Sequence, residues 1–564
     1  MIRTFQEHKI RNVVSLDGEW FFITDPQGVG ESLGYTKALP AQAKKRYVPS
    51  VWNTDLGLLE YDGIAWYGRE FETWGGAARL HFGGVMTVAD VWVDGIHVGN
   101  HYGGFTSFDV ELPTLDAGVH YVSVKVDNTF DGASIPEKMV DWYHYGGITR
   151  SVSLEELSGI CILSLKANYT LDIACNTADL GFSVVVKNYA STPLTSPLVV
   201  TFENHQWTKE ISLSSLETQE VVFEATTIQE ISLWDMDTPC LYTISAHTDT
   251  DDLYDRMGFR EIKAKKGKLY LNGKELTIKG VCRHEEHPDF GFAFPEGLME
   301  RDLDIIKNMN ANAIRGAHYP NAKYFLDLLD ERGVLFWSEI PIWGVGYSSE
   351  MIGQPKFVER AHAMIREMAD QYHNHPSIII WGIHNEIPSD SENGLALSKL
   401  LYGELKSRND GRLITYASAR PMTDICFEYC DLICINQYVG WYRDEIPEWQ
   451  KAVDDFRQRR ETLGFQDKPV IYSEFGAAAL YGHHTFDDIR WTEEYQARLI
   501  DHCIRLFLSD EMVCGCYIWQ YCDIRTSPDA GLNRARGFNN KGLVNEYRRP
   551  KLAYGATKNA YADF

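Results

Sequence analysis

Short runs of alternating hydrophobic and polar residues dominate the start of the chain. Arg79–Phe82, Val88–Val93 and Tyr121–Val126 are three of these runs, and Gly, Asp and Asn residues separate them. Alternation over about four to eight residues is typical of strands that bury one face. We therefore predict an antiparallel β-sandwich as the first domain, over residues 1–158.

A second stretch, residues 159–265, also has the pattern of short strands. Phe182–Val186 and Ile211–Leu213 are strand-length runs of this kind. No cluster of the residue types that perform catalysis occurs in this part of the sequence. We predict that it forms an immunoglobulin-like spacer sandwich with a scaffold role.

The pattern changes after Lys268, where apolar runs of strand length alternate with amphipathic helical stretches. This succession is typical of βα units around a parallel sheet. The eight strand candidates are Leu276–Val281, Ala313–Arg315, Val334–Trp337, Ile378–Ile383, Leu413–Tyr416, Leu432–Asn436, Val470–Ser473 and Cys516–Trp519. Eight such strands predict a (β/α)₈ TIM barrel over residues 266–564, with its chemistry at the C-terminal ends of the strands.

Composition and charge exclude several classes of function. The chain has 564 residues, of which 44% are hydrophobic and 24% charged, as expected of a multidomain globular protein. Its net charge of -25 disfavours nucleic acid and anionic membranes as partners. The N-terminal residues lack the apolar stretch of a signal peptide, and the eleven cysteines lack the spacing of a disulfide framework. We therefore expect a cytoplasmic protein.

Two glutamates directly follow apolar strand candidates. Glu386 ends the segment HisAsnGlu after the fourth candidate, and Glu474 begins the segment GluPheGly after the seventh. Carboxylates rarely close an apolar strand unless they are solvated or functional. Both lie at the catalytic rim of one barrel, so we expect the separation of about 5 to 5.5 Å that retaining glycosidases use. One carboxylate then attacks the anomeric carbon while the other, still protonated, donates to the departing oxygen.

The segments that contain these glutamates resemble glycoside hydrolase family 2. Residues 374–386 resemble the acid/base motif of that family, and residues 471–476 resemble its nucleophile motif. The segments that resemble its jelly-roll sugar-binding domain are AspGlyGluTrp at 17–20, ValProSerValTrpAsn at 48–53 and ValTrpValAspGly at 91–95. The resemblance spans nearly the whole chain. It implies that Glu386 is the acid/base, that Glu474 is the nucleophile and that Asn385 binds the sugar 2-hydroxyl.

Within this family, the chain most resembles the β-glucuronidases. It has their Asn-x-Lys pattern at Asn539 and Lys541, which in those enzymes grips the C6 carboxylate. Arg534 and Arg536 add local positive charge. We therefore expect an exo-acting enzyme that hydrolyses terminal β-D-glucuronides. The alternatives are a β-galacturonidase or β-galactosidase of the same family and, from a different class, a non-catalytic carbohydrate-binding protein.

The resemblance also implies further substrate-binding residues. They are Asp141, His318, Asn436, Tyr438, Tyr442 and Trp519, together with Arg536, Asn539 and Lys541. Trp519 is expected to form the apolar floor of the pocket. The expected ligand is a small glycoside or the end of an oligosaccharide, and the expected assembly is a homo-oligomer that uses no cofactor.

Two patterns that invite a metal site are interpreted as structural. HisGluGluHis at 284–287 places its histidines three residues apart, whereas the helical zinc motif needs four. Cys426, Cys430 and Cys434 include one residue within the sixth strand candidate, and buried free cysteine is common. We therefore expect no metal ion.

Loop lengths bear on the substrate. The segment Gly344–Pro355 is shorter than the lid that some of the similar bacterial β-glucuronidases carry, so we expect an open active-site mouth. The loop Arg525–Arg536 is extended and is a candidate partial replacement for that lid. An open mouth favours sugar conjugates and oligosaccharide ends over small aromatic aglycones.

Overall fold

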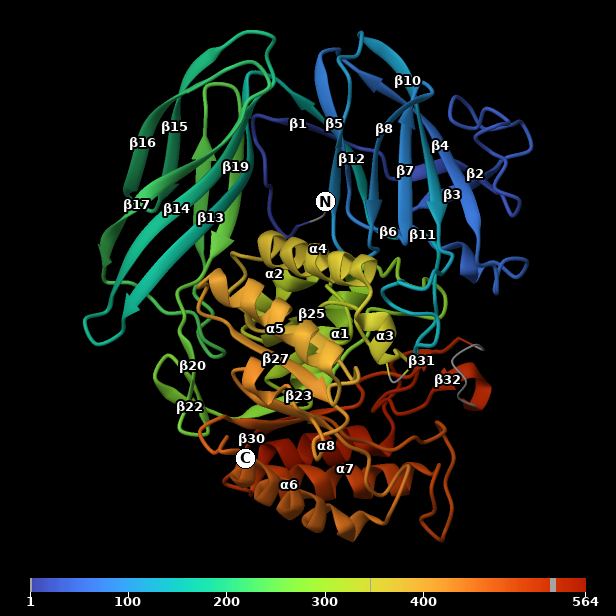
Figure 1. Cartoon of the computed structure of the whole chain (residues 1–564), viewed down its shortest axis with the longest axis vertical. Coiled ribbons are helices and arrows are strands. Elements are labelled where there is room, and N and C mark those ends of the chain that lie inside the picture. Colours follow the sequence, from blue (N-terminus) through green and yellow to red (C-terminus); the bar gives the residue numbers. More distant parts are fainter. Residues whose placement is uncertain (1–2, 345, 528–533) are drawn as a thin grey trace.

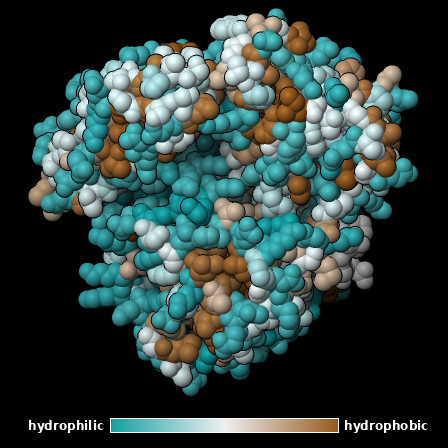
Figure 2. Space-filling view, turned by 45° about the horizontal axis from the view of Figure 1, so that its top comes forward, coloured by the Kyte–Doolittle hydropathy of each residue, from teal (hydrophilic) through white to brown (hydrophobic). Residues whose placement is uncertain are grey.

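The computed structural model describes residues 3–344, 346–527 and 534–564. Two β-sandwiches stand side by side on a C-terminal barrel (Figure 1). Mainly hydrophilic residues cover the hollowed face between the two sandwiches (Figure 2). No helix among the described residues has both the length and the apolar character of a membrane span. The predicted fold class, two sandwiches followed by a TIM barrel, is confirmed.

The first sandwich packs two antiparallel sheets face to face. The six-stranded sheet has the order β3 (Lys44–Val48), β2 (Gly18–Thr24), β4 (Ile64–Thr73), β10 (Gly118–Asp127), β7 (Val88–Val93) and β8 (Ile96–Tyr102). The four-stranded sheet has the order β1 (Asn12–Ser15), β12 (Val152–Leu157), β5 (Ala77–Phe82) and β9 (Phe108–Glu111). Trp20, Trp52 and Leu80 are buried in the core between them, so the alternating pattern of the sequence marks the inward faces.

The second sandwich is also antiparallel. Its sheets have the orders β13 (Ile160–Asp172), β14 (Thr177–Asn188), β17 (Thr218–Gln229) and β16 (His205–Leu213), β15 (Leu194–Phe202), β18 (Tyr242–His247), β19 (Asp252–Met257). Phe182, Val184 and Phe202 belong to its core. A small sheet of β20 (Ile262–Lys265), β21 (Lys268–Leu271) and β22 (Lys274–Leu276) then leads into the barrel.

Eight parallel strands close the barrel in sequence order. They are β23 (Ile278–Cys282), β24 (Ala313–Gly316), β25 (Leu335–Glu339), β26 (Ile378–Asn385), β27 (Leu413–Ser418), β28 (Ile433–Asn436), β29 (Val470–Glu474) and β30 (Val513–Ile518). Each matches a predicted strand, but β30 begins at Val513, three residues earlier than predicted. Gly515 interrupts the apolar run there, and the structure requires it, because a Cβ would lie 2.4 Å from Ile278.

The barrel helices present apolar faces to these strands. They are α1 (Glu296–Asn308), α2 (Lys323–Arg332), α3 (Ser349–Ile352), α4 (Pro355–Gln371), α5 (Glu392–Ser407), α6 (Trp449–Leu463), α7 (Glu493–Leu508) and α8 (Leu552–Ala562). Ser391 and Thr492 cap α5 and α7 by accepting hydrogen bonds from backbone amides of the first turn. Leu303, Ile365 and Leu499 are fully buried in the cluster between helices and strands.

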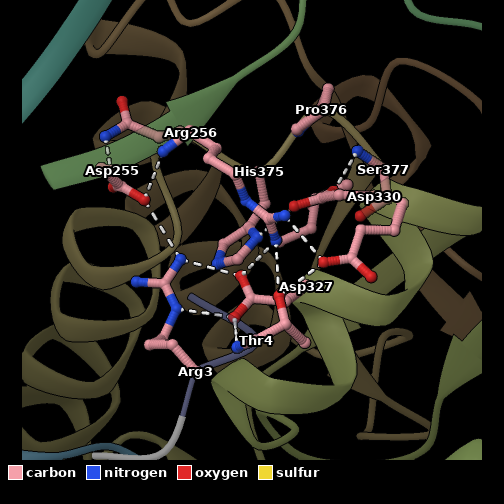
Figure 3. A network of polar contacts seen from close by, with 12 residues as sticks. Arg3, Thr4, Asp255, Arg256, Asp327, Asp330, His375, Pro376 and Ser377 are labelled. Carbon is pink, nitrogen blue, oxygen red and sulfur yellow. Dashed lines mark hydrogen bonds and ion pairs between the residues drawn. The ribbon is translucent and has the colours of Figure 1, made fainter. Parts of the chain in front are cut away.

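The N-terminal segment joins the second sandwich to the barrel (Figure 3). Arg3 forms ion pairs with Asp327 of α2 at 2.8 Å and with Asp255 of β19 at 3.1 Å. Asp330 and His375 lie beside them, 2.5 Å apart. Asp327, Asp330 and His375 have the spacing of metal ligands, but the Arg3 guanidinium already neutralises Asp327. This cluster is therefore a joint between domains.

The segment HisGluGluHis at 284–287 attaches the first sandwich to the barrel. Arg150 of the sandwich pairs with Glu285 at 2.9 Å, and the hydroxyl of Tyr145 donates to Glu286 at 2.6 Å. The side chains of Tyr145, Glu285 and Glu286 are buried, and that of Arg150 is half-buried. These contacts place Glu285 and Glu286 at the interface between the two domains.

Candidate active site

A cavity of about 500 Å³ opens at the C-terminal ends of the barrel strands. Residues of the barrel and of the first sandwich line it together: Asp141, Trp343, Glu386, Ala419, Asn436, Gln437, Tyr438, Tyr442, Arg443, Glu474, Trp519, Arg534 and Lys541. Most of the predicted site residues are among them. Asn385 and Asn539 lie directly behind the lining and hydrogen-bond to it, and His318 stacks on Trp519 of the lining. Arg536 does not reach the cavity.

The two predicted glutamates lie in this one cavity and are both buried. Glu474 is the last residue of β29, and Glu386 directly follows β26. Glu386 has a φ of 55°, a left-handed conformation that costs a non-glycine residue about 1 kcal/mol or more and is typical of functional sites. The amide of Asn436 donates to Glu386 Oε1 at 2.9 Å, and the hydroxyl of Tyr438 donates to Glu474 Oε2 at 2.6 Å.

The surroundings of the two carboxyls favour different protonation states. Burial, reinforced by the negative charge of Glu474, raises the pKa of Glu386 to about 8. Burial also raises the pKa of Glu474, but the Arg315 guanidinium and the Tyr438 hydroxyl oppose that rise. Near neutral pH, Glu386 therefore holds a proton while Glu474 is the better stabilised anion, as acid and nucleophile require.

Arg315, near the end of β24, is the cation that contacts Glu474. Its Nη1 donates to Glu474 Oε1 at 2.8 Å, and its Nη2 donates to Asn385 Oδ1 at 2.7 Å. The same guanidinium pairs with Glu339, the last residue of β25, at 3.0 Å. Neither Arg315 nor Glu339 was predicted, although both are polar ends of barrel strands. Like Glu386 and Glu474, they are charged residues at the C-terminal ends of apolar strands.

Two polar residues behind the lining, His318 and Asn385, complete this side of the cavity. His318 Nδ1 lies 2.7 Å from Glu339 Oε1, and its ring stacks on Trp519 with centroids 4.9 Å apart. Burial holds the pKa of His318 well below its usual value, so the ring is neutral. Asn385 accepts hydrogen bonds through Oδ1 from Arg315 and Asn436, and its buried Nδ2 has no partner among the described residues. That amide is free to donate to a ligand.

A second part of the cavity lining carries two cations. Lys541 Nζ donates to the hydroxyl of Tyr442 at 2.8 Å, and Arg534 Nη2 donates to the same oxygen at 3.3 Å. Arg534 also pairs with Asp141 of the first sandwich, and Asn539 donates to that carboxylate at 2.8 Å. Three segments far apart in sequence therefore meet at this end of the cavity.

Of the two arginines expected to add local positive charge, only Arg534 lines the cavity, whereas Arg536 is the one that was predicted to bind the substrate. Arg536 pairs with Glu546 at 2.9 Å and donates to Asn540 at 3.1 Å, pointing away from the lining. Arg534, two residues earlier, occupies the position at the cavity. Residue spacing alone does not tell these side chains apart, because Arg536 has a φ of 61° that turns the backbone between them.

Two loops that the sequence predicts at the mouth lie partly outside the described residues. The segment Gly344–Pro355 contains the short helix α3 and leads directly into α4, and Val345 lies outside the described residues. The predicted extended loop Arg525–Arg536 includes residues 528–533, which also lie outside the described residues. The described ends of that loop contact the first sandwich, through Arg525 and Asn53 and through Arg534 and Asp141.

Two buried carboxyls at the strand ends of a TIM barrel, with separate acid and anion environments, define the chain as a glycoside hydrolase. It belongs to glycosyl hydrolases family 2. The model of that family's TIM barrel domain matches residues 262–564, and the model of its sugar binding domain matches residues 13–158.

Known relatives are similar over the whole chain. The structure of a GH2 β-galacturonidase from Eisenbergiella tayi bound to galacturonate has a TM-score of 0.93 and 38% identity, covering 100% of this chain and 99% of that one. A β-glucuronidase of Paenibacillus borealis is 26% identical over 96% of each chain. A putative β-glucuronidase of Formosa agariphila is 28% identical over 91% of this chain, which spans 66% of that longer protein.

Proposed function

We propose that the chain is a retaining exo-β-uronidase that releases glucuronic acid from terminal β-D-glucuronides. The observation that carries this proposal is the buried ammonium of Lys541, which shares the cavity with Glu386 and Glu474. Among the described residues, no carboxylate lies within 4.0 Å of it to form an ion pair. A buried charge without a counterion is costly, so the site is complementary to an anion that the ligand supplies.

The proposed reaction has two steps. First, Glu474 forms a bond to the anomeric carbon while the bond from that carbon to the aglycone oxygen breaks and Glu386 gives its proton to that oxygen. Next, Glu386 takes a proton from water, and the water oxygen attacks the same carbon and expels Glu474. Each step inverts the anomeric centre, so the released sugar keeps the β configuration.

The neighbours of the two glutamates fit these roles. Arg315 and the Tyr438 hydroxyl stabilise Glu474 as the attacking and leaving carboxylate. The free Nδ2 of Asn385 is a donor for the sugar 2-hydroxyl, a contact that strengthens in the transition states of glycosidases. Trp519 offers an apolar surface to the C–H face of the pyranose.

A second candidate substrate is the C4 epimer, a β-D-galacturonide. The specific observation in its favour is the 38% identity and full coverage of the galacturonidase structure, compared with 26% for the Paenibacillus borealis β-glucuronidase. Both sugars carry the C6 carboxylate, so Lys541 supports either of them. They differ only in the orientation of the C4 hydroxyl.

A panel of four 4-nitrophenyl β-D-glycosides tests the proposal, because glucuronide, galacturonide, glucoside and galactoside vary the carboxylate and C4 independently. We expect kcat/KM on the glucuronide to exceed that on the glucoside at least tenfold, by about 1.4 kcal/mol. A preference for galacturonide would replace the first candidate with the second. Faster hydrolysis of the neutral sugars would contradict a uronidase, and proton NMR showing the α anomer as first product would contradict retention.

A further inference from the structure

A buried ion pair lies next to the segment Asn539–Gly542, outside the cavity. Lys551 and Asp523 are almost completely inaccessible to solvent, and Lys551 Nζ lies 2.8 Å from Asp523 Oδ1. Neither residue lines the cavity. Burying two charges costs desolvation free energy that apolar side chains of similar size avoid. The hydrogen bonds of the pair therefore indicate which part of the structure it holds in place.

The pair holds both peptide groups that flank Lys541. Lys551 Nζ donates to the carbonyl of Asn540 at 3.0 Å, on the N-terminal side of Lys541. Asp523 Oδ1 accepts from the amide of Gly542 at 2.8 Å, on its C-terminal side. Gly542 packs so closely against Asp523 that a Cβ at this position would lie 2.2 Å from the amide nitrogen of Asp523. The backbone of Lys541 is therefore fixed from both sides.

The same ammonium also reaches the nucleophile side of the barrel. Its third hydrogen bond goes to the carbonyl of Ala479 at 2.8 Å, in the loop that follows Glu474. An ammonium has three donors, and here one carboxylate and two carbonyls use all of them. Lys551 thus links the loop that follows Glu474 to the segment that carries Lys541.

We propose that the Asp523–Lys551 pair positions Lys541 and thereby gives the enzyme its selectivity for acidic over neutral sugars. A lysine side chain has four flexible carbons, so its ammonium occupies one place in the cavity only if its backbone is held rigidly. Lys551 and Asp523 are positioning residues in this proposal, since neither lines the cavity that receives the sugar. The proposal rests on the proposed function, because it concerns recognition of the uronate.

The central experiment compares wild type with Lys551→Met on 4-nitrophenyl β-D-glucuronide and on the matched glucoside. We expect kcat/KM on the preferred uronide to fall about tenfold, mainly through KM, while kcat/KM on the glucoside changes less than about twofold. A merely structural role would lower both activities together. An equal loss on both substrates, or no change in their ratio, overturns the proposal.

A double-mutant cycle with Lys541→Ala sharpens the result. If Lys551 acts through Lys541, adding Lys551→Met to Lys541→Ala should cost the uronide little more than Lys541→Ala alone. Fully additive losses contradict positioning. Asp523→Asn, which keeps the size of the side chain and removes its charge, is the second variant should Lys551→Met fail to fold, and it should shift the substrate ratio in the same direction.

Arg11→Met is the matched control. Arg11 belongs to another buried ion pair, with Asp251 at 2.6 Å, between the N-terminal segment and the second sandwich. Its loss should lower the melting temperature without changing the ratio of uronide to glucoside activity. A wild-type enzyme with no preference for uronides overturns the proposed function together with this inference. A wild-type preference that Lys551→Met leaves unchanged overturns the inference alone.

Discussion

The two sides of the active-site cavity are built in different ways. On the catalytic side, Glu386, Glu474, Arg315 and Glu339 all end strands of one closed barrel, so the register of the sheet fixes their mutual positions. On the recognition side, Lys541 belongs to a loop segment held by buried hydrogen bonds from other parts of the chain. In the proposed function, bond cleavage and sugar selection therefore depend on separate structural elements, so substitutions should affect one without the other.

Removing the nucleophile should have the largest effect. Glu474→Ala deletes the group that we propose bonds to the anomeric carbon, so kcat/KM should fall by at least about 10⁴-fold, or about 5 kcal/mol, on acidic and neutral sugars alike. Steady-state rates on the four glycosides measure this. Added azide should restore turnover and give the α-glycosyl azide, because it attacks from the vacated side. Activity near that of the wild type would rule out this role for Glu474.

Removing the proton donor should have an effect that depends on the leaving group. Glu386→Ala should slow a uronide with a poor leaving group about 10²- to 10⁴-fold, but a 2,4-dinitrophenyl uronide far less, since that aglycone leaves without a proton. In the wild type, activity should be present below pH 8 and lost as the pH rises through the Glu386 pKa of about 8, because Glu386 then loses the proton that it donates. The variant should lack this loss above pH 8. An unchanged alkaline limb would show that another group titrates there.

Changing the recognition side should alter selectivity and leave the chemistry intact. Lys541→Ala should lower kcat/KM on the uronide about 10- to 100-fold, the value of one charge-assisted hydrogen bond, and leave the glucoside nearly unchanged. Arg536→Ala is the matched control, because this cation pairs with Glu546 outside the cavity, and its effect should stay below about threefold. Equal effects of the two substitutions would contradict the assignment of Lys541.

A single hydrogen bond on the catalytic side should have the smallest effect. Tyr438→Phe removes the 2.6 Å bond to Glu474, so kcat should fall about tenfold for all four glycosides. Because this hydroxyl lowers the pKa of Glu474, its loss raises that pKa and should move the acidic limb of the pH profile to higher pH. Tyr472→Phe is the control, since its buried hydroxyl has no partner among the described residues. A loss of kcat or a shift of the acidic limb seen only with the uronide would contradict this role of Tyr438.

The difference between the two sides also explains how much the sequence predicts. Strand ends are local features, so the apolar runs before Glu386 and Glu474 place both residues at the rim of the barrel. Arg315 and Glu339 also lie at the ends of apolar strand runs, so their places at the rim of the barrel are predictable in the same way. All eight barrel strands are predicted for the same reason, with errors of a few residues where Gly515 or a neighbouring sheet interrupts the pattern.

Contacts between distant segments are not encoded in any local pattern. Asp141 and Arg534 are 393 positions apart, and nothing in the spacing of residues 534–542 shows that Arg534 rather than Arg536 faces the cavity. The Asp523–Lys551 pair is not visible in the sequence either, because a lysine that follows Arg548, Arg549 and Pro550 has the composition of an exposed loop. Only the packed backbone shows that this lysine is buried.

Asp141 comes from the first sandwich, so the cavity is built from two domains of the chain. A gene fragment that encodes the barrel alone supplies both glutamates but lacks Asp141, the residue that the first sandwich contributes to the described lining. It also leaves Arg534 and Asn539 without the carboxylate that they bind. Exchange of the segment around Asp141 between homologues is a route to new sugar preferences that leaves the inherited hydrolytic chemistry in place.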